Sequence, residues 1–241
     1  MNLNNLNVIK TEGQIWFKKF LNKEKILTLK NLQKKLVKNL LWEIVKFLKI
    51  NIEGQQEREI LAMLSAVVSG NYHYSYQIPN NPPKEVSLLK ALNLINTEEL
   101  LPIKNALFSA INQLKWNIDD GLFYETNSEI GNDYLNGNMH TELIGPKNGV
   151  FKRDDLRLGL FLLEPKIFYK DHKHEAPELY LNLSNGTSWR FETKEWISKK
   201  AGSVIYNKPF RVHAMKVSNQ PFLAVWCWPH NSLKKCILVH R

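Results

Sequence analysis

The stretch YKDHKHEAPELY, residues 169–180, contains two histidines, two tyrosines and Glu178. Each of these residue types can bind a metal ion or transfer a proton. Because side chains alternate between the two faces of a strand, His172 and His174 are expected to point the same way. Tyr180 lies two residues beyond Glu178 and shares its face where the chain is extended. The stretch therefore predicts a strand with one chemically competent face.

A third histidine, His213, follows residues 201–212, whose sequence AGSVIYNKPFRV predicts a turn, a strand and a second turn. Two histidines on one strand, a glutamate on its continuation and a histidine on another strand can converge inside a barrel. The candidate metal ligands are His172, His174, Glu178 and His213. Nitrogen and carboxylate ligands without a thiolate suit one divalent transition metal, which is Fe, Mn, Zn, Ni or Co. The alternative is that the histidines of residues 169–180 are surface residues of a charged strand.

From about Trp116 onward the sequence consists of short β-like runs separated by Gly, Asn, Pro or Asp. The runs are LRLGLFLL (156–163), IFYKDHKH (167–174), LYLNL (179–183), TSWRFE (187–192), SVIYN (203–207) and FLAVWCW (222–228). Many short strands with turn residues between them, and no interleaved helices, predict a sandwich or a closed barrel.

The first half of the chain, from residue 13 to about residue 115, has a helical pattern instead. Within residues 31–50, apolar side chains recur every three or four positions, which predicts one apolar helix face. They are Leu32, Leu36, Leu40, Ile44 and Phe47. Further helices are expected within residues 56–69, 84–95 and 98–114, the last preceded by Asn96 and Thr97 as candidate caps. We expect a helical region, residues 1–115, that packs on a β-barrel with a metal site, residues 116–241.

The formal net charge of the 241 residues is +10, and ten lysines stand against Glu24 and Glu43 in residues 13–52. Such an excess raises the question of a nucleic-acid partner. Arginine, the usual base-reading residue, is scarce in this segment. We interpret the lysines mainly as a solvated helix face and expect no nucleic-acid partner.

Cellular location is constrained by three features of the sequence. No apolar run approaches the roughly 20 residues of a membrane span. The N-terminal MNLNNLNVIKTEG lacks the basic-then-apolar layout of a signal peptide. Two cysteines, Cys227 and Cys236, are too few for a disulfide framework. A cytoplasmic protein with free thiols fits best, and a homodimer is compatible with the sequence.

The pattern HxHxxxE at residues 172–178, followed by a glycine, Pro209 and His213, resembles the two-part signature of the cupin superfamily. Cupins are small β-barrels with a metal in the lumen. The resemblance implies a mainly β fold, a cupin double-stranded β-helix or jelly-roll barrel. Because an α-helical region precedes the barrel, the chain is expected to be α+β overall.

A closer resemblance, over roughly residues 116–230, is to the cupin-type dimethylsulfoniopropionate (DMSP) lyases. It rests on TELIGP (141–146), DDLRLGLFLLEP (154–165), YKDHKHEAPELYLNLSNGTSWRF (169–191), AGSVIYNKPFRVHAM (201–215) and PFLAVWCW (221–228). Its most specific part is YxxHxHxxxExY, because the two tyrosines do not belong to the general cupin signature. The resemblance implies a carbon–sulfur lyase that cleaves zwitterionic DMSP to dimethyl sulfide and acrylate.

The resemblance also implies roles for individual residues. Tyr180 is expected to remove the proton α to the carboxylate, and Tyr169 to contact the substrate and assist proton transfer. His174, Glu178 and His213 match the metal ligands of the family. His172 is either a fourth ligand or a hydrogen-bond donor behind the ligands.

The sulfonium end of the substrate requires a pocket for a cation. Aromatic faces attract cations, by roughly 0.5 to 2 kcal/mol for each ring. Trp228 and Tyr206 are the expected substrate-binding rings. For Trp228, this role is implied by the resemblance. Trp189 and Trp226 are expected to belong to the barrel core.

Other functions are compatible with the same ligand set. Two histidines and one carboxylate leave open positions at iron, as a cupin dioxygenase requires. A non-catalytic cupin could bind a small acid and engage a partner through the basic helices. A sugar isomerase is a further alternative, because one fold hosts many chemistries.

Overall fold

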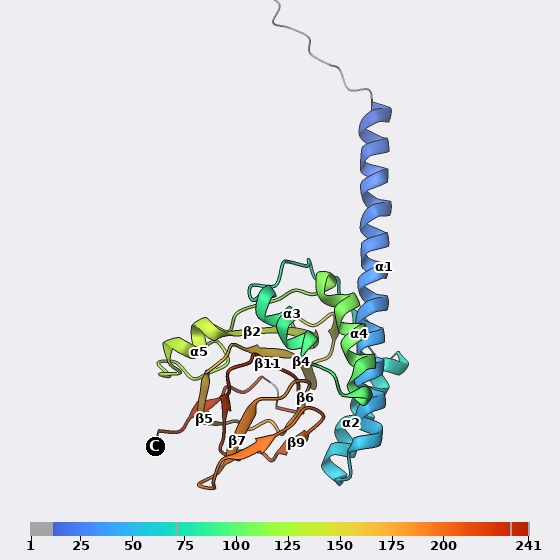
Figure 1. Ribbon diagram of the computed structural model, residues 1–241. Coiled ribbons are helices and arrows are strands. Elements are labelled where there is room, and N and C mark those ends of the chain that lie inside the picture. Colours follow the sequence, from blue (N-terminus) through green and yellow to red (C-terminus); the bar gives the residue numbers. More distant parts are fainter. Residues whose placement is uncertain (1–11, 71, 232, 241) are drawn as a thin grey trace, which may run out of the picture.

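In the computed structural model of this protein, residues 12–70, 72–231 and 233–240 are described, with only the backbone given for residues 12–22. A long helix runs along one side of a body of β-strands and extends well beyond it (Figure 1). Residues 1–11, which make up most of the N-terminal stretch without signal-peptide features, lie outside the described residues.

Helices occupy most of the chain before residue 114. They are α1 (Glu12–Asn51), α2 (Gln55–Ser69), α3 (Glu85–Asn93), α4 (Leu101–Ala110) and the 3₁₀ turns η1 (Glu98–Leu100) and η2 (Ile111–Gln113). One short helix, α5 (Asn132–Gly137), follows later in the chain. Gly70 ends α2 in a left-handed conformation with φ of +119°, which a glycine adopts without steric cost. Thr97 precedes η1 as expected, but its side chain makes no capping hydrogen bond.

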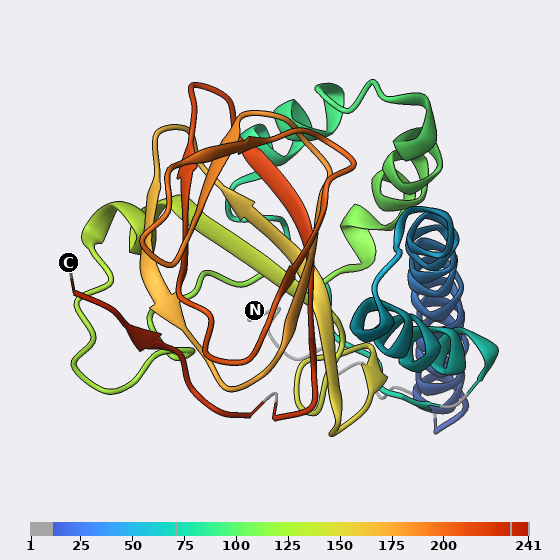
Figure 2. The same cartoon turned by 90° about the horizontal axis from the view of Figure 1, so that it is seen from below.

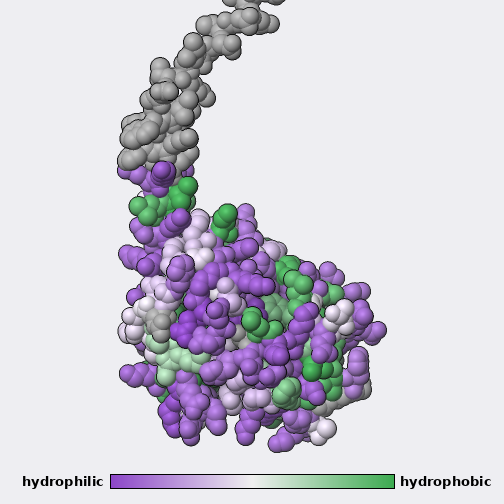
Figure 3. Space-filling view, turned by 180° about the vertical axis from the view of Figure 1, so that it is seen from behind, coloured by the Kyte–Doolittle hydropathy of each residue, from purple (hydrophilic) through white to green (hydrophobic). Residues whose placement is uncertain are grey.

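The apolar face of α1 begins later than its sequence pattern indicates. Leu40, Ile44 and Phe47 are buried, whereas Leu32 is 41% exposed. The neighbouring Gln33 is fully buried, so α1 is already packed against the body at this level and Leu32 lies on the side of the helix that faces away from it. The earlier part of α1 extends past the edge of the body (Figure 1). Seen from behind, hydrophobic side chains form small groups between hydrophilic ones, including a group where the helix leaves the body (Figure 3).

The β half forms two facing sheets. Its strands are β1 (His73–Tyr74), β2 (Asn138–Ile144), β3 (Phe151–Lys152), β4 (Leu156–Leu163), β5 (Phe168–Lys173), β6 (Glu178–Asn182), β7 (Thr187–Phe191), β8 (Ile197–Lys199), β9 (Val204–Asn207), β10 (His213–Val217), β11 (Phe222–Pro229) and β12 (Ile237–Leu238). One sheet has the order β1-β3-β2-β4-β11-β6-β9 and the other the order β12-β5-β10-β7-β8. All but one of the neighbouring strands are antiparallel, the exception being β2 and β3. All six runs predicted from the sequence form strands.

The strands of the seven-stranded sheet are buried on both faces, and the side chains alternate between two cores. On β11, Phe222, Ala224, Trp226 and Trp228 belong to the core between the sheets. Leu223, Val225 and Cys227 belong to the core shared with the helices. The same alternation runs along β4 and β6, where Leu156, Leu158, Leu160, Leu162, Leu179 and Leu181 face the helices. Alternate side chains along each strand therefore point either into the lumen between the sheets or toward the helices that cover the sheet.

The helical cover and the outer face of this sheet form one continuous core. Buried residues of α1, α2, α3 and α4 lie in the same cluster as the outward side chains of β4, β6 and β11. From below, α1, α2 and α4 lie along one side of the barrel, and the short α5 lies on the opposite side (Figure 2). The division at residue 115 stays a prediction, because the hydrophobic contacts continue across it.

The tyrosine-rich segment between α2 and α3 is held to α1 by a buried amide. Gln33 donates from Nε2 to the carbonyls of Gln77 and Gln113, both at 2.7 Å. Its Oε1 accepts from the backbone N–H of Gln77 at 3.0 Å. Within this segment, His73 and Tyr74 form β1 at the edge of the sheet.

These features confirm the predicted class, an α-helical region followed by a cupin double-stranded β-helix. Gly159 on β4 is needed for close packing, because a Cβ there would lie 2.0 Å from the Thr141 carbonyl oxygen of β2. That Cβ would also lie 2.9 Å from Nε1 of Trp226.

None of the described helices is long and apolar enough to cross a membrane.

Removal of one leucine from the shared core tests how much this packing contributes. Leu160→Ala deletes a fully buried side chain between β4 and the helices. We expect the free energy of unfolding to fall by about 2–5 kcal/mol, measured by urea denaturation. Leu27→Ala on α1, where the leucine is 58% exposed, is the control and should change it by less than about 0.5 kcal/mol. Equal effects of the two substitutions would contradict a shared core.

Candidate metal centre and active site

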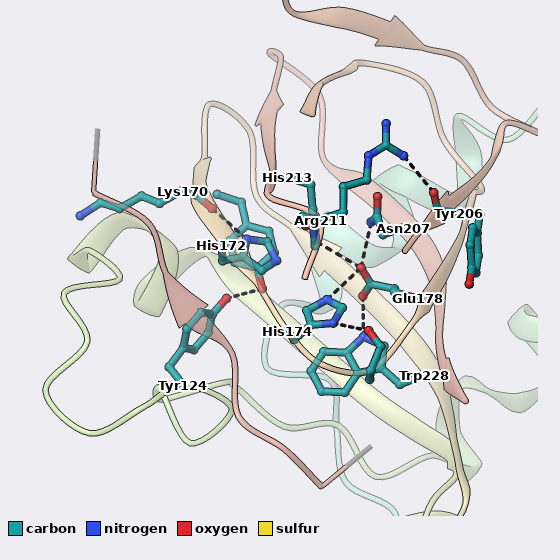
Figure 4. Close-up of polar contacts among 12 residues, drawn as sticks. Tyr124, Lys170, His172, His174, Glu178, Tyr206, Asn207, Arg211, His213 and Trp228 are labelled. Carbon is teal, nitrogen blue, oxygen red and sulfur yellow. Dashed lines mark hydrogen bonds and ion pairs between the residues drawn. The ribbon is translucent and has the colours of Figure 1, made fainter. Parts of the chain in front are cut away.

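Three histidines meet inside the barrel. His172 lies on β5, His174 follows the end of that strand, and His213 is the first residue of β10. Antiparallel pairing of β5 and β10 sets His213 opposite His172. One potential ligand atom from each histidine lies within 4.8 Å of the others, and all three side chains are buried. The sequence pattern and the strand register thus bring together residues 41 positions apart (Figure 4).

The imidazole rings are oriented by backbone carbonyls. Nδ1 of His172 lies 2.8 Å from the Lys170 carbonyl oxygen. Nδ1 of His174 lies 2.7 Å from the Ala176 carbonyl, and Nδ1 of His213 lies 2.9 Å from that of Arg211. A proton on each Nδ1 satisfies these contacts and leaves the Nε2 lone pair as an acceptor. This is the orientation that metal-binding histidines adopt, with the second nitrogen fixed by a carbonyl.

Glu178, the first residue of β6, completes the group. Its Oε2 lies 3.3 Å from Nε2 of His174 and 3.2 Å from Nε2 of His213. These two Nε2 atoms are buried and make no hydrogen bond of acceptable geometry with any described group. Asn207 donates to Oε2 at 3.1 Å and Trp228 Nε1 donates to Oε1 at 2.6 Å, so the carboxylate is fixed from behind.

The electrostatics suit a cation between these groups. Burial alone would raise the pKa of the Glu178 carboxyl, but His174 and His213 outweigh it and hold that pKa well below its usual range. Burial, and then the neighbouring His213 and His174, lower the pKa of His172. Burial also opposes protonation of His174, yet Glu178 raises the pKa of that ring. An ionised carboxylate beside imidazole nitrogens provides the oxygen and nitrogen donors that a divalent transition metal requires.

The orphaned Nε2 atoms, the fixed rings and the buried carboxylate therefore fit a metal ion. Among the described residues, the histidines form a group that could hold one, and the identity of the ion is open to any metal that accepts nitrogen and oxygen ligands. Neither cysteine contributes, since Cys227 faces the helices and Cys236 lies on the wall of the lumen.

Two tyrosines lie beside the histidines. Tyr169 of β5 packs with its ring centroid 4.3 Å from that of His172, and it stacks on Tyr134 at 4.6 Å. The Tyr124 hydroxyl donates a hydrogen bond to the Tyr169 hydroxyl. Tyr180 of β6 lies opposite Trp226 of β11 and shares its face of the sheet. Burial is the main reason that the pKa values of Tyr169 and Tyr180 lie well above 10, and Glu178 raises both further.

The tyrosines open onto a cavity of about 50 Å³, here called the inner cavity. Its wall near the histidines consists of Tyr169, Glu178, Tyr180 and Trp228, and the remaining wall consists of Asp119, Phe123, Tyr134, His140, Phe161, Trp226 and Cys236. An outer hollow of about 440 Å³ shares Asp119, Phe123 and His140 with it. These three residues thus lie between the barrel interior and the surface.

The aromatic residues named from the sequence take different positions. Trp228 lines the inner cavity, as expected for a substrate-binding ring. Tyr206 does not, because it lies opposite Leu179 on the face of the sheet that packs against the helices. Glu57 and Glu59 of α2 contribute, after burial, to raising its pKa. Trp189 is fully buried between the sheets, whereas Trp226 also forms part of the cavity wall.

Several cavity residues were not predicted. Asp119 and Phe123 come from the connection between η2 and α5, which has no periodic pattern. Tyr134 and His140 lie within GNDYLNGNMH, residues 131–140, where the run of Gly and Asn indicates only a turn. Nothing in the sequence pattern distinguishes these residues from those of an ordinary loop.

Comparisons with known proteins agree with this site. The family model described as dimethylsulfoniopropionate lyase matches residues 56–224, more than half of the chain. A chain from crystal structures of the DMSP lyases RdDddP and RnDddQII has a TM-score of 0.67 at 20% identity, over 86% of this chain and 100% of that one. The DMSP lyase DddQ from Ruegeria pomeroyi DSS-3 has a TM-score of 0.59 at 21% identity, over 76% and 95%.

A cupin-like protein from Thermotoga maritima has a TM-score of 0.37 at 16% identity, over 42% of this chain and 75% of that one. A comparison with proteins of curated function gives no match. At these identities, the two crystal structures with the higher TM-scores show that the fold is shared.

Substitution of one histidine tests the metal centre. His213→Gln removes a ligand nitrogen from the group, and we expect divalent-metal affinity to fall by at least about 100-fold. The measurement is the metal content of gel-filtered protein after loading with Mn²⁺ or Zn²⁺, determined by mass spectrometry. His140→Gln is the matched control, because His140 lines the cavity outside the group and its loss should leave the metal content unchanged. Full occupancy in His213→Gln would exclude this centre.

His140 should also make stability depend on pH. Burial, and then the Arg157 guanidinium, lower the pKa of His140 to about 4 from 6.5. As the pH falls from 6.5 to 4, the unfolded chain takes up a proton that the folded protein does not, so the free energy of unfolding falls. This contribution amounts to at most about 3 kcal/mol.

We therefore expect His140→Gln to lose less stability than the wild type between pH 6.5 and pH 4, measured by urea denaturation at several pH values. Replacement of the exposed His73 by Gln should leave the wild-type pH dependence intact. Parallel curves for His140→Gln and the wild type would show that His140 is not kept neutral in the fold.

Proposed function

The chain belongs to the dimethylsulfoniopropionate lyase family, and from this premise we propose that it cleaves DMSP to dimethyl sulfide and acrylate, with one divalent metal ion held by its buried histidines. The observation that carries the proposal is the meeting of His172, His174 and His213 with Glu178 at one end of a cavity that Tyr169 and Tyr180 also line. This combination supplies a cation site and a proton acceptor in one enclosed space.

The reaction is a β-elimination. A base removes the proton α to the carboxylate, and the electrons of that C–H bond form the carbon–carbon double bond. The bond between the β-carbon and sulfur breaks with its electron pair going to sulfur, which leaves as neutral dimethyl sulfide. The protein must therefore provide a base, stabilise negative charge near the carboxylate and accommodate a cation that becomes neutral.

Tyr180 is the proposed base. To act as a base, the Tyr180 phenol must first lose its proton. Burial opposes this loss by raising the pKa of Tyr180 well above 10, and the Glu178 carboxylate raises that pKa further. When bound, a divalent metal supplies positive charge, which favours an adjacent tyrosinate and stabilises the negative charge that develops at the substrate carboxylate. Tyr180 is thus expected to act as a base only when the metal centre is filled.

The proposed metal ligands are His174, Glu178 and His213, with His172 as the fourth. The carbonyl contacts of the three rings support this assignment, since they leave each Nε2 directed away from its own backbone partner. Tyr169 is proposed to contact the substrate and assist proton transfer from its position between His172 and Tyr134.

Trp228 is proposed to contribute to substrate binding through its ring. Its indole N–H is used by Glu178, so the side chain is fixed by its edge while it lines the cavity. The ring can then attract the sulfonium by a cation–π interaction, worth roughly 0.5 to 2 kcal/mol. Trp228 thereby links the carboxylate ligand to the substrate pocket.

Dimethyl sulfide release from DMSP tests the proposal. Protein loaded with Fe²⁺, Mn²⁺ or Zn²⁺ should produce the gas, measured by headspace gas chromatography, and a chelator should abolish it. Tyr180→Phe should lower kcat at least about 100-fold while retaining metal, because it removes the base but no ligand.

Tyr206→Phe is the matched control and should retain activity, since Tyr206 faces the helices. If folded, metal-loaded protein released no dimethyl sulfide with any of these ions, the substrate assignment would be wrong. Oxygen-dependent products would indicate a dioxygenase instead.

A further inference from the structure

Asp119 is a buried carboxylate on the wall of the inner cavity. Only 4% of the residue's surface is exposed to solvent. Asp119 borders both the inner cavity and the outer hollow. A buried carboxylate is costly unless a cation or hydrogen bonds compensate for lost hydration. Its position in a cavity of aromatic side chains therefore needs an explanation.

The position of Asp119 is fixed by its neighbours. Its backbone N–H donates to Oδ1 of the buried Asn138 at 2.7 Å, and its carbonyl accepts from Nδ2 of Asn138 at 2.9 Å. The carboxylate accepts from the Gly121 N–H at 2.9 Å and from the Tyr134 hydroxyl at 2.8 Å. These contacts hold the carboxylate rigidly in the wall.

Asp119 forms no salt bridge within the described part of the chain. The Arg157 guanidinium lines the outer hollow with Asp119, but it pairs with Glu142 and lies over the rings of Phe123 and Trp226. Burial is the main cause of its raised pKa, and the neighbouring charged group that acts on it is Asp120, a second carboxylate. The hydrogen bonds from Tyr134 and Gly121 oppose the rise but add no positive charge.

Asp119 and Glu178 both line the inner cavity. Glu178 belongs to the histidine group, whereas Asp119 hydrogen-bonds Tyr134. Both carboxylates raise the pKa values of Tyr169 and Cys236, so these two side chains lie within range of each. A small molecule in the cavity can therefore contact both the carboxylate of the histidine group and that of Asp119.

Aromatic rings form much of the wall of the inner cavity. Phe123, Tyr134, Phe161 and Trp226 line the same cavity. The ring centroids of Phe123 and Trp226 lie 6.5 Å apart, and those of Tyr134 and Phe161 lie 6.4 Å apart. Aromatic faces attract an alkylated cation, and they exclude the water that would weaken its attraction to a carboxylate.

We propose that Asp119 determines specificity for cationic substrates, with its carboxylate and the rings of Phe123, Tyr134, Phe161 and Trp226 forming a subsite for a methylated onium group. The inference rests on the proposed function in taking that group to be the sulfonium of DMSP. A zwitterion then lies with its carboxylate toward the histidines and its cation toward Asp119. An acid of the same shape with a neutral end leaves Asp119 without a partner and binds less tightly.

Two ligands of equal shape and different charge test the inference without requiring turnover. One is 3-(trimethylammonio)propionate, and the other is 4,4-dimethylpentanoate, in which carbon replaces the cationic nitrogen. Their dissociation constants are measured by titration calorimetry with metal-loaded wild-type protein. We expect the cationic ligand to bind at least about tenfold more tightly, the factor that one charge-assisted contact provides.

Asp119→Asn should reduce this preference by about tenfold while the melting temperature and metal content stay near the wild-type values. Asparagine retains an acceptor for Gly121 and a polar group for Tyr134, so the local hydrogen bonds can persist. Asp154→Asn is the control, since it removes the same charge from an exposed residue that lines neither cavity and should leave the preference unchanged.

Each outcome separates this inference from the proposed function. A wild-type protein that binds both ligands equally overturns the inference, whether or not Asp119→Asn folds. An unchanged preference in folded Asp119→Asn also overturns it, even if the wild type releases dimethyl sulfide. An Asp119-dependent preference without dimethyl sulfide release supports the cation subsite and overturns the lyase assignment instead.

Discussion

The architecture depends on one constraint, that the central strands of the seven-stranded sheet are buried on both faces. On β4, β6 and β11, one set of alternate side chains packs under the helices and the other faces the lumen. An antiparallel sheet with one face in water would need polar residues at every second position. Here the helical cover removes the outer face from water, so both sets are buried. The lumen can then be lined by aromatic and ionisable side chains, because the outer leucines hold the sheet in place.

The chemical character of the lumen follows from desolvation. The same burial that raises the pKa values of Tyr169 and Tyr180 lowers that of His172, since each shift disfavours the charged form of its group. Glu178 stays ionised against this tendency because His174 and His213 lie beside it. The lumen is thus a place where charge is retained only next to a compensating charge. A metal ion and a zwitterionic ligand would each satisfy that condition.

The sequence was informative where residues obey a period or a fixed spacing. The six β-like runs followed from alternation and from turn residues, and the meeting of His172 with His213 was expected from the spacing that resembles the cupin signature. The face of Tyr206 could not be predicted in this way, because it is decided by pairing with Leu179 of β6, a long-range register. Asp119 and Tyr134 were missed for a related reason: they reach the cavity from irregular segments, and the buried Asn138 fixes the first of these by tertiary hydrogen bonds. Local patterns carry no information about such contacts.

The wall of the inner cavity also includes a thiol, that of Cys236. Acrylate, the product of the proposed reaction, is an electron-poor alkene, and a thiolate is the form of cysteine that adds to such electrophiles. Burial, and then Glu178 and Asp119, raise the pKa of Cys236 well above its usual value, so the group stays a protonated thiol at neutral pH. If the proposed reaction takes place here, a thiol kept protonated by desolvation would add to acrylate more slowly than a thiolate, and the site would be shielded from its own product.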